Sequence, residues 1–453
     1  MTRAGDSSDT ADPQRSDRAR VPGHRDITRL AGPIIVSNLS TPLLGAVDTA
    51  VMGHLPDAAY LGAVAVGSVI FSFLYWGFGF LRMGTTGFTA QAHGAADRDE
   101  LRACLGRPLI LACLIGALLI ALQWPIGAVA FALMDASAQV ESLAGTYFAV
   151  RIWSAPFALV NYAVLGWLLG TQRARHALML QVALNGINIG LDLLFVVGMG
   201  YTIAGVAAAS LIAEIVAAGL GLGLCVHLLR RTGGTWSRAR LLDRASLIRL
   251  FRVNRDIFVR TLSLIFAFAY FTAKGAEFGE TTLAANAILM QLQNVLSYGL
   301  DGFAHATETL VGSAFGARNR TAFRAAVRTA TIWAGGVALL FAAVLALGGP
   351  AILSLFTDIP EVRERALTYL PWMIASPFVS IWAFQLDGVF IGATQTRAMR
   401  NAMLACVAFY VAAVWLLTPA LGNHGLWLAL MLFLGARGAS LATAYPALER
   451  RLR

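Results

Sequence analysis

The sequence has few charged residues for its length. Of its 453 residues, only 13% are charged and 57% are hydrophobic, whereas a soluble domain is usually about a quarter charged. So few charges cannot cover the surface of a soluble enzyme of this size. So many apolar residues also exclude a largely disordered chain, because disorder requires low hydrophobicity. An integral membrane protein with several spanning helices remains.

Other features are scarce or missing. Lys274 is the only lysine among 35 basic residues. The four cysteines lie far apart, without metal-site or redox spacing, so we expect them to be small packing residues. No P-loop, HExxH or GxSxG motif occurs, and the arginines form no dense patch. We therefore expect no enzyme activity, no resident cofactor, no direct use of ATP and no nucleic-acid partner.

Long apolar segments dominate what is present. A helix crosses a hydrocarbon core of ~30 Å in about 20 residues, and none of the segments alternates as the strands of a barrel do. We therefore predict an all-α polytopic membrane protein with twelve transmembrane helices. The spans are expected at residues 28–53, 59–83, 105–130, 144–170, 177–198, 203–229, 253–275, 282–304, 325–347, 366–391, 399–418 and 424–446.

The arginines predict the orientation of these spans. They concentrate in the N-terminal tail, in the loops after spans 2, 4, 6, 8 and 10, and at the C-terminus. The opposite loops carry almost nothing basic beyond Arg363 and Arg365. Because basic loops stay in the cytoplasm, we expect a multi-pass protein of the bacterial inner (plasma) membrane with both termini cytoplasmic. The net charge of +10 then faces anionic lipid rather than a polyanionic substrate.

The two halves of the chain resemble each other at an offset of 222 residues. The loop Ala92–Arg98 matches Ala314–Arg320, and Arg175 matches Arg397. Six spans per repeat is an even number, so both halves enter from the same side and form two pseudo-symmetric six-helix bundles. Such a plan is typical of an alternating-access transporter. The expected division is a disordered cytoplasmic tail at 1–26, an N-lobe at 27–229, a cytoplasmic linker at 230–252, a C-lobe at 253–448 and a C-terminal tail at 449–453.

Two aspartates in the first half are candidates for function, because a charge inside the bilayer costs at least ~2.5–3.5 kcal/mol and usually faces a cavity. Asp48 lies late in span 1, beyond Pro42, which removes a helix hydrogen bond and is expected to kink the helix. Asp192 lies in span 5. Both reach the outer half of the membrane, where they can share one pocket. Two such carboxylates can load and release a proton or hold a sodium ion.

Further polar residues surround this pair. Asn185, Asn188 and Asp192 fall at i, i+3 and i+7, which places them on one helical face. Ser210 and Glu214 fall at i and i+4 in span 6. Oxygens of Asn188 and Ser210 can help to hold a bound cation. The alternative is that these residues only pack helices through hydrogen bonds, as single asparagines in membrane helices often do.

The second half carries a different set of candidates. Asp301 in span 8 and Asp387 in span 10 are expected toward the cytoplasmic half, where they can attract cationic cargo or pair with Arg260, Arg82 or His305. Glu308 is expected at the cytoplasmic interface, Lys274 near the outer end of span 7, and His93 in a packing role. The repeat aligns the acids with uncharged residues: Asp48 with Tyr270, Asp301 with Gly79 and Glu308 with Thr86.

Several motifs resemble the MATE (multidrug and toxic compound extrusion) family. They are Asp48–Leu55 in span 1, Gln91–Ala95 after span 2, Pro156-Phe157 in span 4, and Asn188 with Asp192 in span 5. The segment Leu300–Ala304, followed by Glu308, resembles the corresponding segment in the DinF-like branch of the family. The resemblance covers residues 27–446.

The resemblance implies a V-shaped pair of lobes and export of organic cations and drugs in exchange for protons or sodium. Bending of span 1 on protonation is a step proposed for the family, and Pro42 is suitably placed for it. Some branches use acids in spans 7 and 10; here span 7 offers Lys274 instead, while span 10 keeps Asp387. The family's N-lobe cation site corresponds here to Asp48, Asn188, Asp192 and, less directly, Ser210.

The sequence therefore favours a secondary active multidrug antiporter that exports organic cations in exchange for H+ or Na+. We expect a monomer whose partners are small-molecule drugs, the coupling ion (with Na+ as a candidate bound ion) and membrane lipids. The alternative is a flippase for lipids or lipid-linked oligosaccharides, from the related superfamily with the same topology. A membrane receptor or scaffold without transport is a third hypothesis.

Overall fold

The computed structural model describes residues 21–53, 58–134 and 137–452, without the side chains of 41–46, 48–53 and 58. All regular elements in these ranges are helical, which confirms the predicted all-α class. The first half contains α2 (His24–Gly53), α3 (Ala58–Gly77), α4 (Phe80–Ala95), α5 (Arg98–Ala121), α6 (Gln123–Met134), α7 (Ala138–Arg151), η1 (Ile152–Ser154), α8 (Ala155–Gly170), α9 (Ala174–Asp192), η2 (Leu193–Gly198) and α10 (Ile203–Thr232). The second half contains α11 (Arg238–Leu241), α12 (Arg244–Ala276), α13 (Glu280–Gly316), α14 (Arg320–Ser354), α15 (Pro360–Gly392), α16 (Thr396–Leu421) and α17 (Asn423–Arg450).

Most of these helices match the predicted spans. Within the described ranges, 10 helical segments are long and apolar enough to cross a membrane. Four of them are composite: α3 continues into α4, α7 continues through η1 into α8, α9 continues into η2, and α11 precedes α12. The two long helices outside this set, α2 and α13, have 30 and 37 residues. They complete six long helical segments in each half.

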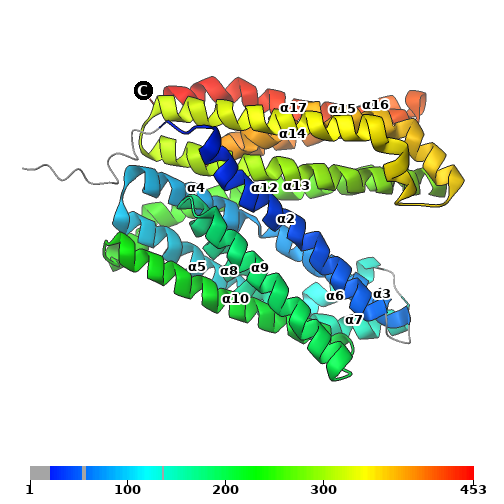
Figure 1. Ribbon diagram of the computed structural model, residues 1–453, viewed down its shortest axis with the longest axis horizontal. Coiled ribbons are helices and arrows are strands. Elements are labelled where there is room, and N and C mark those ends of the chain that lie inside the picture. Colours follow the sequence, from blue (N-terminus) through cyan, green and yellow to red (C-terminus); the bar gives the residue numbers. More distant parts are fainter. Residues whose placement is uncertain (1–20, 54–57, 135–136, 453) are drawn as a thin grey trace, which may run out of the picture.

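The helices form two bundles that meet at one end of the molecule. Figure 1 shows α2–α10 in one bundle and α12–α17 in the other, close together near the C-terminus and diverging toward the opposite end. We call these bundles the N-lobe and the C-lobe. The end at which they meet carries the loops in which arginines concentrate, and we call it the arginine-rich end. The predicted fold class, a V-shaped pair of six-helix bundles, is therefore confirmed.

The backbone preserves the internal repeat found in the sequence. Four described non-glycine residues have positive φ, and they form two pairs 222 residues apart. Ala96 and Arg318 both have φ of 51°, and Gln172 (61°) corresponds to Thr394 (53°). These left-handed turns end helices at equivalent places in the two halves. The helix caps are repeated too, because Asp97 and Asn319 each accept a hydrogen bond from a backbone amide three residues ahead.

The lobes touch most closely where α4 crosses α13. A Cβ atom on Gly94 would collide with the backbone of Ser313, and a Cβ atom on Gly316 would collide with the backbone of Gln91. These two contacts are equivalent under the 222-residue offset. Glycine is required at both positions because the two backbones lie in direct contact. We call this α4–α13 boundary the seam.

Hydrogen bonds reinforce the seam at the arginine-rich end. Gln91 of α4 donates to the carbonyl of Gly392 at 2.9 Å and to the hydroxyl of Thr394 at 3.2 Å. Arg249 of α12 donates to the same hydroxyl at 2.9 Å and to Gln91 Oε1 at 3.2 Å. The end of α4 is thereby bound to the end of α15 and to α12.

The connection between the lobes is folded against α5. Arg102 donates to the carbonyls of Leu229 and Gly233 at 2.8 to 3.1 Å. Arg240 pairs with Asp97 at 2.6 Å. Partial burial would raise the pKa of Asp97, but the Arg240 hydrogen bond and charge, with backbone amides, lower it below its usual value. The connection between the lobes is therefore held against the N-lobe by these hydrogen bonds and by the Arg240–Asp97 ion pair.

Several boundaries differ from those expected from the sequence. The first helix already begins at His24, inside the segment 1–26. Much of the segment 230–252 is helical, since α10 extends to Thr232 and α12 starts at Arg244. Apolar periodicity could not place these ends because the extensions are polar and lie outside the apolar runs. Three cysteines are buried as expected, but Cys113 on α5 is exposed.

Replacing Gly94 with alanine should weaken the seam. We expect Gly94→Ala to destabilise the protein by about 1–3 kcal/mol, as overpacking does elsewhere. Thermal denaturation of the purified protein in detergent measures the change. The matched control is Gly223→Ala on α10, where nothing lies within 4 Å of an added Cβ atom. The control should be neutral or stabilising by up to about 1 kcal/mol, and equal effects of the two variants would contradict the seam.

Candidate functional site

Three of the four residues predicted for cation coupling lie together in the N-lobe. Asn188 and Asp192 belong to α9 and Ser210 belongs to α10, and at most 5% of each is exposed. The side chains of Asn188 and Ser210 are 3.0 Å apart. In the amide orientation that satisfies both ends, Asn188 donates to Asp192 Oδ2 at 3.0 Å and accepts from Ser210 Oγ at 3.0 Å. We call these three residues the N-lobe cluster.

The local backbone explains why these side chains meet. Asn188 and Asp192 are four residues apart on α9, so they lie on the same helical face. That face packs against α10, which supplies Ser210. Immediately after Asp192 the chain forms a π-helix, Leu193–Gly198. Such wider turns are rare and occur frequently at functional sites.

The first helix runs alongside this cluster. Asn185 donates to Ser40 Oγ at 2.9 Å, which ties α9 to α2. Residues 33–38 of α2 and 174–181 of α9 line one cavity nearer the start of both helices, so the two helices run in the same direction. Position 48 lies eight residues beyond Ser40, and Asp192 lies seven beyond Asn185. At ~1.5 Å per residue, both reach the same level.

The side chains of Asp48 and Pro42 are outside the described part of the chain. The pairing of Asp48 with Asp192, and the kink at Pro42, therefore stay predictions. The register of α2 against α9 is consistent with the pairing.

Glu214 belongs to a separate polar group. Although it follows Ser210 by one helical turn, its carboxylate accepts from Asn161 of α8 at 2.6 Å. Nearby, Arg151 lies over the rings of Phe71 and Tyr147 at 5.5 and 5.8 Å. One face of α10 thus forms hydrogen bonds with two helices: Ser210 contacts α9, and Glu214 contacts α8.

In the C-lobe, Asp387 is held by two arginines. Its Oδ2 atom accepts from Arg260 of α12 and from Arg437 of α17, the latter at 2.8 Å. All three residues are buried, with 4 to 8% of each exposed. We call this group the C-lobe triad. It confirms the expected pairing of Asp387 with Arg260, and it adds Arg437.

A cavity of about 260 Å³ lies between the lobes, next to α13. Asp301 and His305 line it from α13, and Arg82 lines it from α4. The nearest atoms of Arg82 and His305, Nη1 and Nδ1, are 3.5 Å apart. We call this space the interlobe cavity. It brings Asp301 together with two of the basic residues expected near it.

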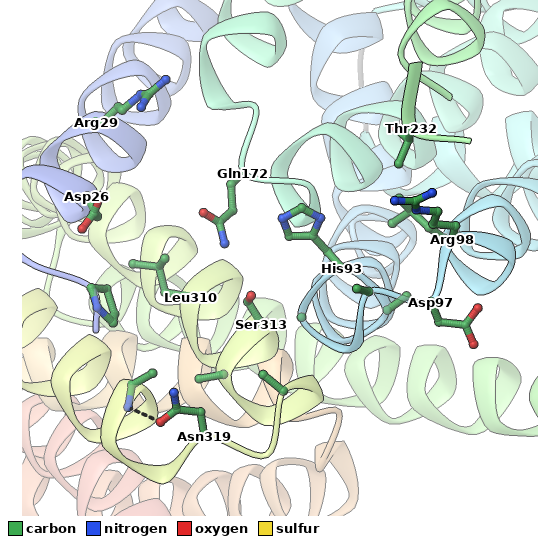
Figure 2. A pocket seen from close by; sticks show the side chains of 18 residues that line it. Asp26, Arg29, His93, Asp97, Arg98, Gln172, Thr232, Leu310, Ser313 and Asn319 are labelled. Carbon is green, nitrogen blue, oxygen red and sulfur yellow. Dashed lines mark hydrogen bonds between the residues drawn. The ribbon is translucent and has the colours of Figure 1, made fainter. Parts of the chain in front are cut away.

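Two expectations for single residues were wrong. Glu308 does not reach the interface at the end of α13, because it is 0% exposed and contacts His305 at 3.2 Å. His93 is not a packing residue: its side chain is exposed, and it lines a cavity of about 300 Å³ at the arginine-rich end. Figure 2 shows His93 on α4 pointing into this space beside Gln172, with Ser313 of α13 nearby.

Lys274 lies apart from every group above. It forms an ion pair with Glu277 at 2.8 Å in the last turn of α12, where 61% of the Glu277 side chain is exposed. The two residues are three positions apart, so the pair is local to one helix end. Neither residue lines the interlobe cavity.

Comparisons with known proteins agree with this architecture. The MatE family model matches residues 33–194 and 257–416, which together exceed half of the chain. The chain belongs to the MATE family. It is 43% identical to the DNA damage-inducible protein F of Escherichia coli, over 92% of this chain and 90% of that protein. It is also 28% identical to a probable multidrug resistance protein NorM of Deinococcus radiodurans, over 92% of this chain and 94% of that one.

Solved structures show the same fold. A MATE crystal structure in a bent conformation has a TM-score of 0.85 at 21% identity, covering 94% of this chain and 96% of that chain. An outward-facing multidrug resistance MATE transporter has a TM-score of 0.82 at 20% identity, covering 97% and 99%. At such identities, the likeness concerns the fold alone.

Some site residues of this MATE family member were not singled out from the sequence. Asn161, the partner of Glu214, is a single asparagine in an apolar helix and gives no periodic signal. Arg437 lies on a different helix from Asp387, and its ion pair with that acid gives no signal in the spacing of either span. The sequence did contain one signal. Arg260 and Arg437 each lie inside an apolar span, and an arginine in that position needs an acidic partner.

Removing the acid of the C-lobe triad should be costly for this MATE family member. We expect Asp387→Asn to lower stability by about 3–5 kcal/mol, because two buried guanidinium groups lose their counter-charge. The matched control is Glu277→Gln, which removes the acid from the exposed pair with Lys274 and should change stability little. Thermal denaturation in detergent compares the two. If the two variants unfold at similar midpoint temperatures, the triad does not stabilise the folded protein.

Proposed function

We propose that the protein is a secondary active antiporter that exports organic cations and drugs in exchange for H+ or Na+. The observation that carries the proposal is the N-lobe cluster, in which the carboxylate of Asp192 is buried with the neutral side chains of Asn188 and Ser210. A buried carboxylate is stable when it binds a proton or a cation. The family membership supports the same function.

The cluster is suited to either coupling ion. Carboxylate, amide and hydroxyl oxygens are the ligands that hard cations prefer. The same carboxylate takes up a proton when it is poorly hydrated. In the proposed site, Asp48 of α2 completes the set at the level of Asp192. Ion binding would then bias how α2 lies against α9, and the two are already linked through Asn185 and Ser40.

Exchange requires that the cavity between the lobes open to one side at a time. We propose that the arginine-rich end faces the cytoplasm of a bacterial cell, as the basic loops indicate. The seam then closes the cytoplasmic side in this structure, while the lobes diverge toward the outside. Cargo would be released outward from this arrangement, and coupling ions would enter from the same side.

The interlobe cavity supports a cationic cargo. Asp301 lines it together with the rings of Tyr162 and Tyr298. A carboxylate attracts a cation, and aromatic faces add to that attraction. Arg82 of α4 lines the same cavity, so the charge of a cationic cargo would lie near Asp301 and away from Arg82.

A flippase for anionic lipid headgroups is less well supported. Such a protein needs cationic side chains that are available in the cavity. Arg260 and Arg437 are bound to Asp387, and Lys274 is bound to Glu277. Most of the intramembrane cations are therefore already paired.

Transport in proteoliposomes tests the proposal. We expect the wild-type protein to move a fluorescent organic cation when a pH gradient or a sodium gradient is imposed, and the gradient that drives movement identifies the ion. Asp192→Asn should reduce gradient-driven movement to the level of liposomes without protein, because the buried acid can no longer load the ion. Glu277→Gln, which changes an exposed acid, should transport like the wild type. Coupled transport that survives in Asp192→Asn would remove the N-lobe cluster from the mechanism.

A further inference from the structure

The seam contains a buried acid that the N-lobe cluster does not use. Glu308 of α13 and Thr86 of α4 are equivalent under the 222-residue offset, and their side chains face each other across the lobe boundary. One turn further along, Gly312 packs against Ala90, which is again its equivalent. These pairs follow the pseudo-twofold axis from Glu308 toward the arginine-rich end. Glu308 is the only ionisable residue among them.

No cation neutralises this carboxyl group. Glu308 is 0% exposed, and no lysine or arginine in the described part of the chain forms an ion pair with it. Its Oε1 atom has no hydrogen-bond partner among the described residues. The Thr86 hydroxyl is shared, because it also donates to the carbonyl of Arg82 at 2.9 Å, and it carries no charge that could balance an ionised Glu308. An ionised carboxylate would be poorly stabilised at this position.

The contacts of His305 indicate where the proton lies. Its Nδ1 atom is 3.5 Å from Arg82 Nη1 and 3.2 Å from Glu308 Oε2. An arginine nitrogen is always a donor, so the contact with Arg82 favours the tautomer in which Nδ1 carries a lone pair. In that tautomer the lone pair would repel an ionised carboxylate, so the 3.2 Å contact favours a Glu308 that carries the hydrogen. With the proton on His305 instead, two N–H groups would point at each other.

Other charged and titratable groups nearby do not change this assignment. Asp301 on the same helix lies seven residues away and faces the interlobe cavity with Tyr162 of α8. Arg260 of α12 and Arg437 of α17 are held by Asp387 of α15. Within the described residues, Arg82 of α4 is therefore the one cation close to Glu308 that is not held by an acid, and it contacts His305.

We propose that Glu308 is a second proton-binding site, which holds a proton while the seam is closed and releases it to the cytoplasm when the seam opens. This inference rests on the proposed orientation and on alternating access. It adds a proton-carrying group in the C-lobe to the N-lobe cluster. It also links that proton to closure of the seam, because only the protonated form is compatible with the buried position.

The proton has a route in each direction. When α4 and α13 separate, water reaches Glu308, its O–H bond breaks and the proton passes to water on the cytoplasmic side. The carboxylate left behind is then hydrated. On return, water in the interlobe cavity, which His305 lines, gives up a proton to the Glu308 carboxylate beside His305. No other reactant is needed.

The position of the seam can be measured without cargo or sodium. Spin labels on Arg231→Cys and Arg328→Cys, both exposed and one on each lobe, would report the lobe separation in the full chain in liposomes. The four native cysteines are first replaced by serine. We expect the wild-type distance to lengthen as pH rises, because loss of the proton from Glu308 opens the seam.

Three variants separate the proton from a structural role. Glu308→Gln imitates the protonated acid, so it should keep the short distance at every pH. Glu308→Asp keeps a titratable group and should retain a pH-dependent distance. Glu277→Gln, which changes an exposed acid outside both proposed sites, should respond like the wild type. A Glu308→Gln protein that follows the wild-type pH profile would overturn the proposal.

Infrared spectroscopy gives a second readout that does not depend on lobe movement. The closed wild-type protein should show carbonyl absorption of a protonated carboxylic acid that is lost in Glu308→Gln and retained in Glu277→Gln. If the band is unchanged in Glu308→Gln, Glu308 is not the protonated group and the inference is wrong. Failure of the wild type to transport under either gradient would instead refute the proposed function, while leaving this measurement intact.

Discussion

The direct backbone contact between α4 and α13 is the constraint on which the rest of the structure depends. Gly94 and Gly316 permit this contact. The two glycines are equivalent under the 222-residue offset, so the contact occurs twice, once on each side of the pseudo-twofold axis. Because the lobes meet in this way at one end, they can diverge at the other. The interlobe cavity and the buried position of Glu308 both follow from that arrangement.

The two lobes treat their buried acids differently. In the N-lobe, Asp192 lies beside the neutral amide of Asn188 and hydroxyl of Ser210, and it is the carboxylate that we propose binds the coupling ion. In the C-lobe, Asp387 is already bound by Arg260 and Arg437 and has no similar capacity. The scaffold is duplicated, but its buried acids are not. Of the other buried acids in the C-lobe, Asp256 pairs with Arg255 and Arg400, and Glu308 lies on the seam.

The sequence could predict whatever depends on one helix or on the repeat. Apolar length and alternating arginines predicted the spans, and the spacing of Asn188 and Asp192 predicted their common face. Contacts between distant helices could not be predicted this way. Arg437 contacts Asp387, which lies 50 residues earlier in the chain, and Glu308 is buried because other helices pack around α13. Glu308 was predicted at the membrane interface from its position along the helix. That position says nothing about which other helices pack against the side chain.

The C-lobe triad also constrains the order in which the protein is made. Arg260 is synthesised 127 residues before Asp387, which at about 5–20 residues per second is a delay of roughly 6–25 s. During that interval α12 carries a guanidinium group without its acid, and such a helix is poorly retained in lipid. The triad is therefore complete only after α15 and then α17 have been synthesised, so the C-lobe reaches its final packing late.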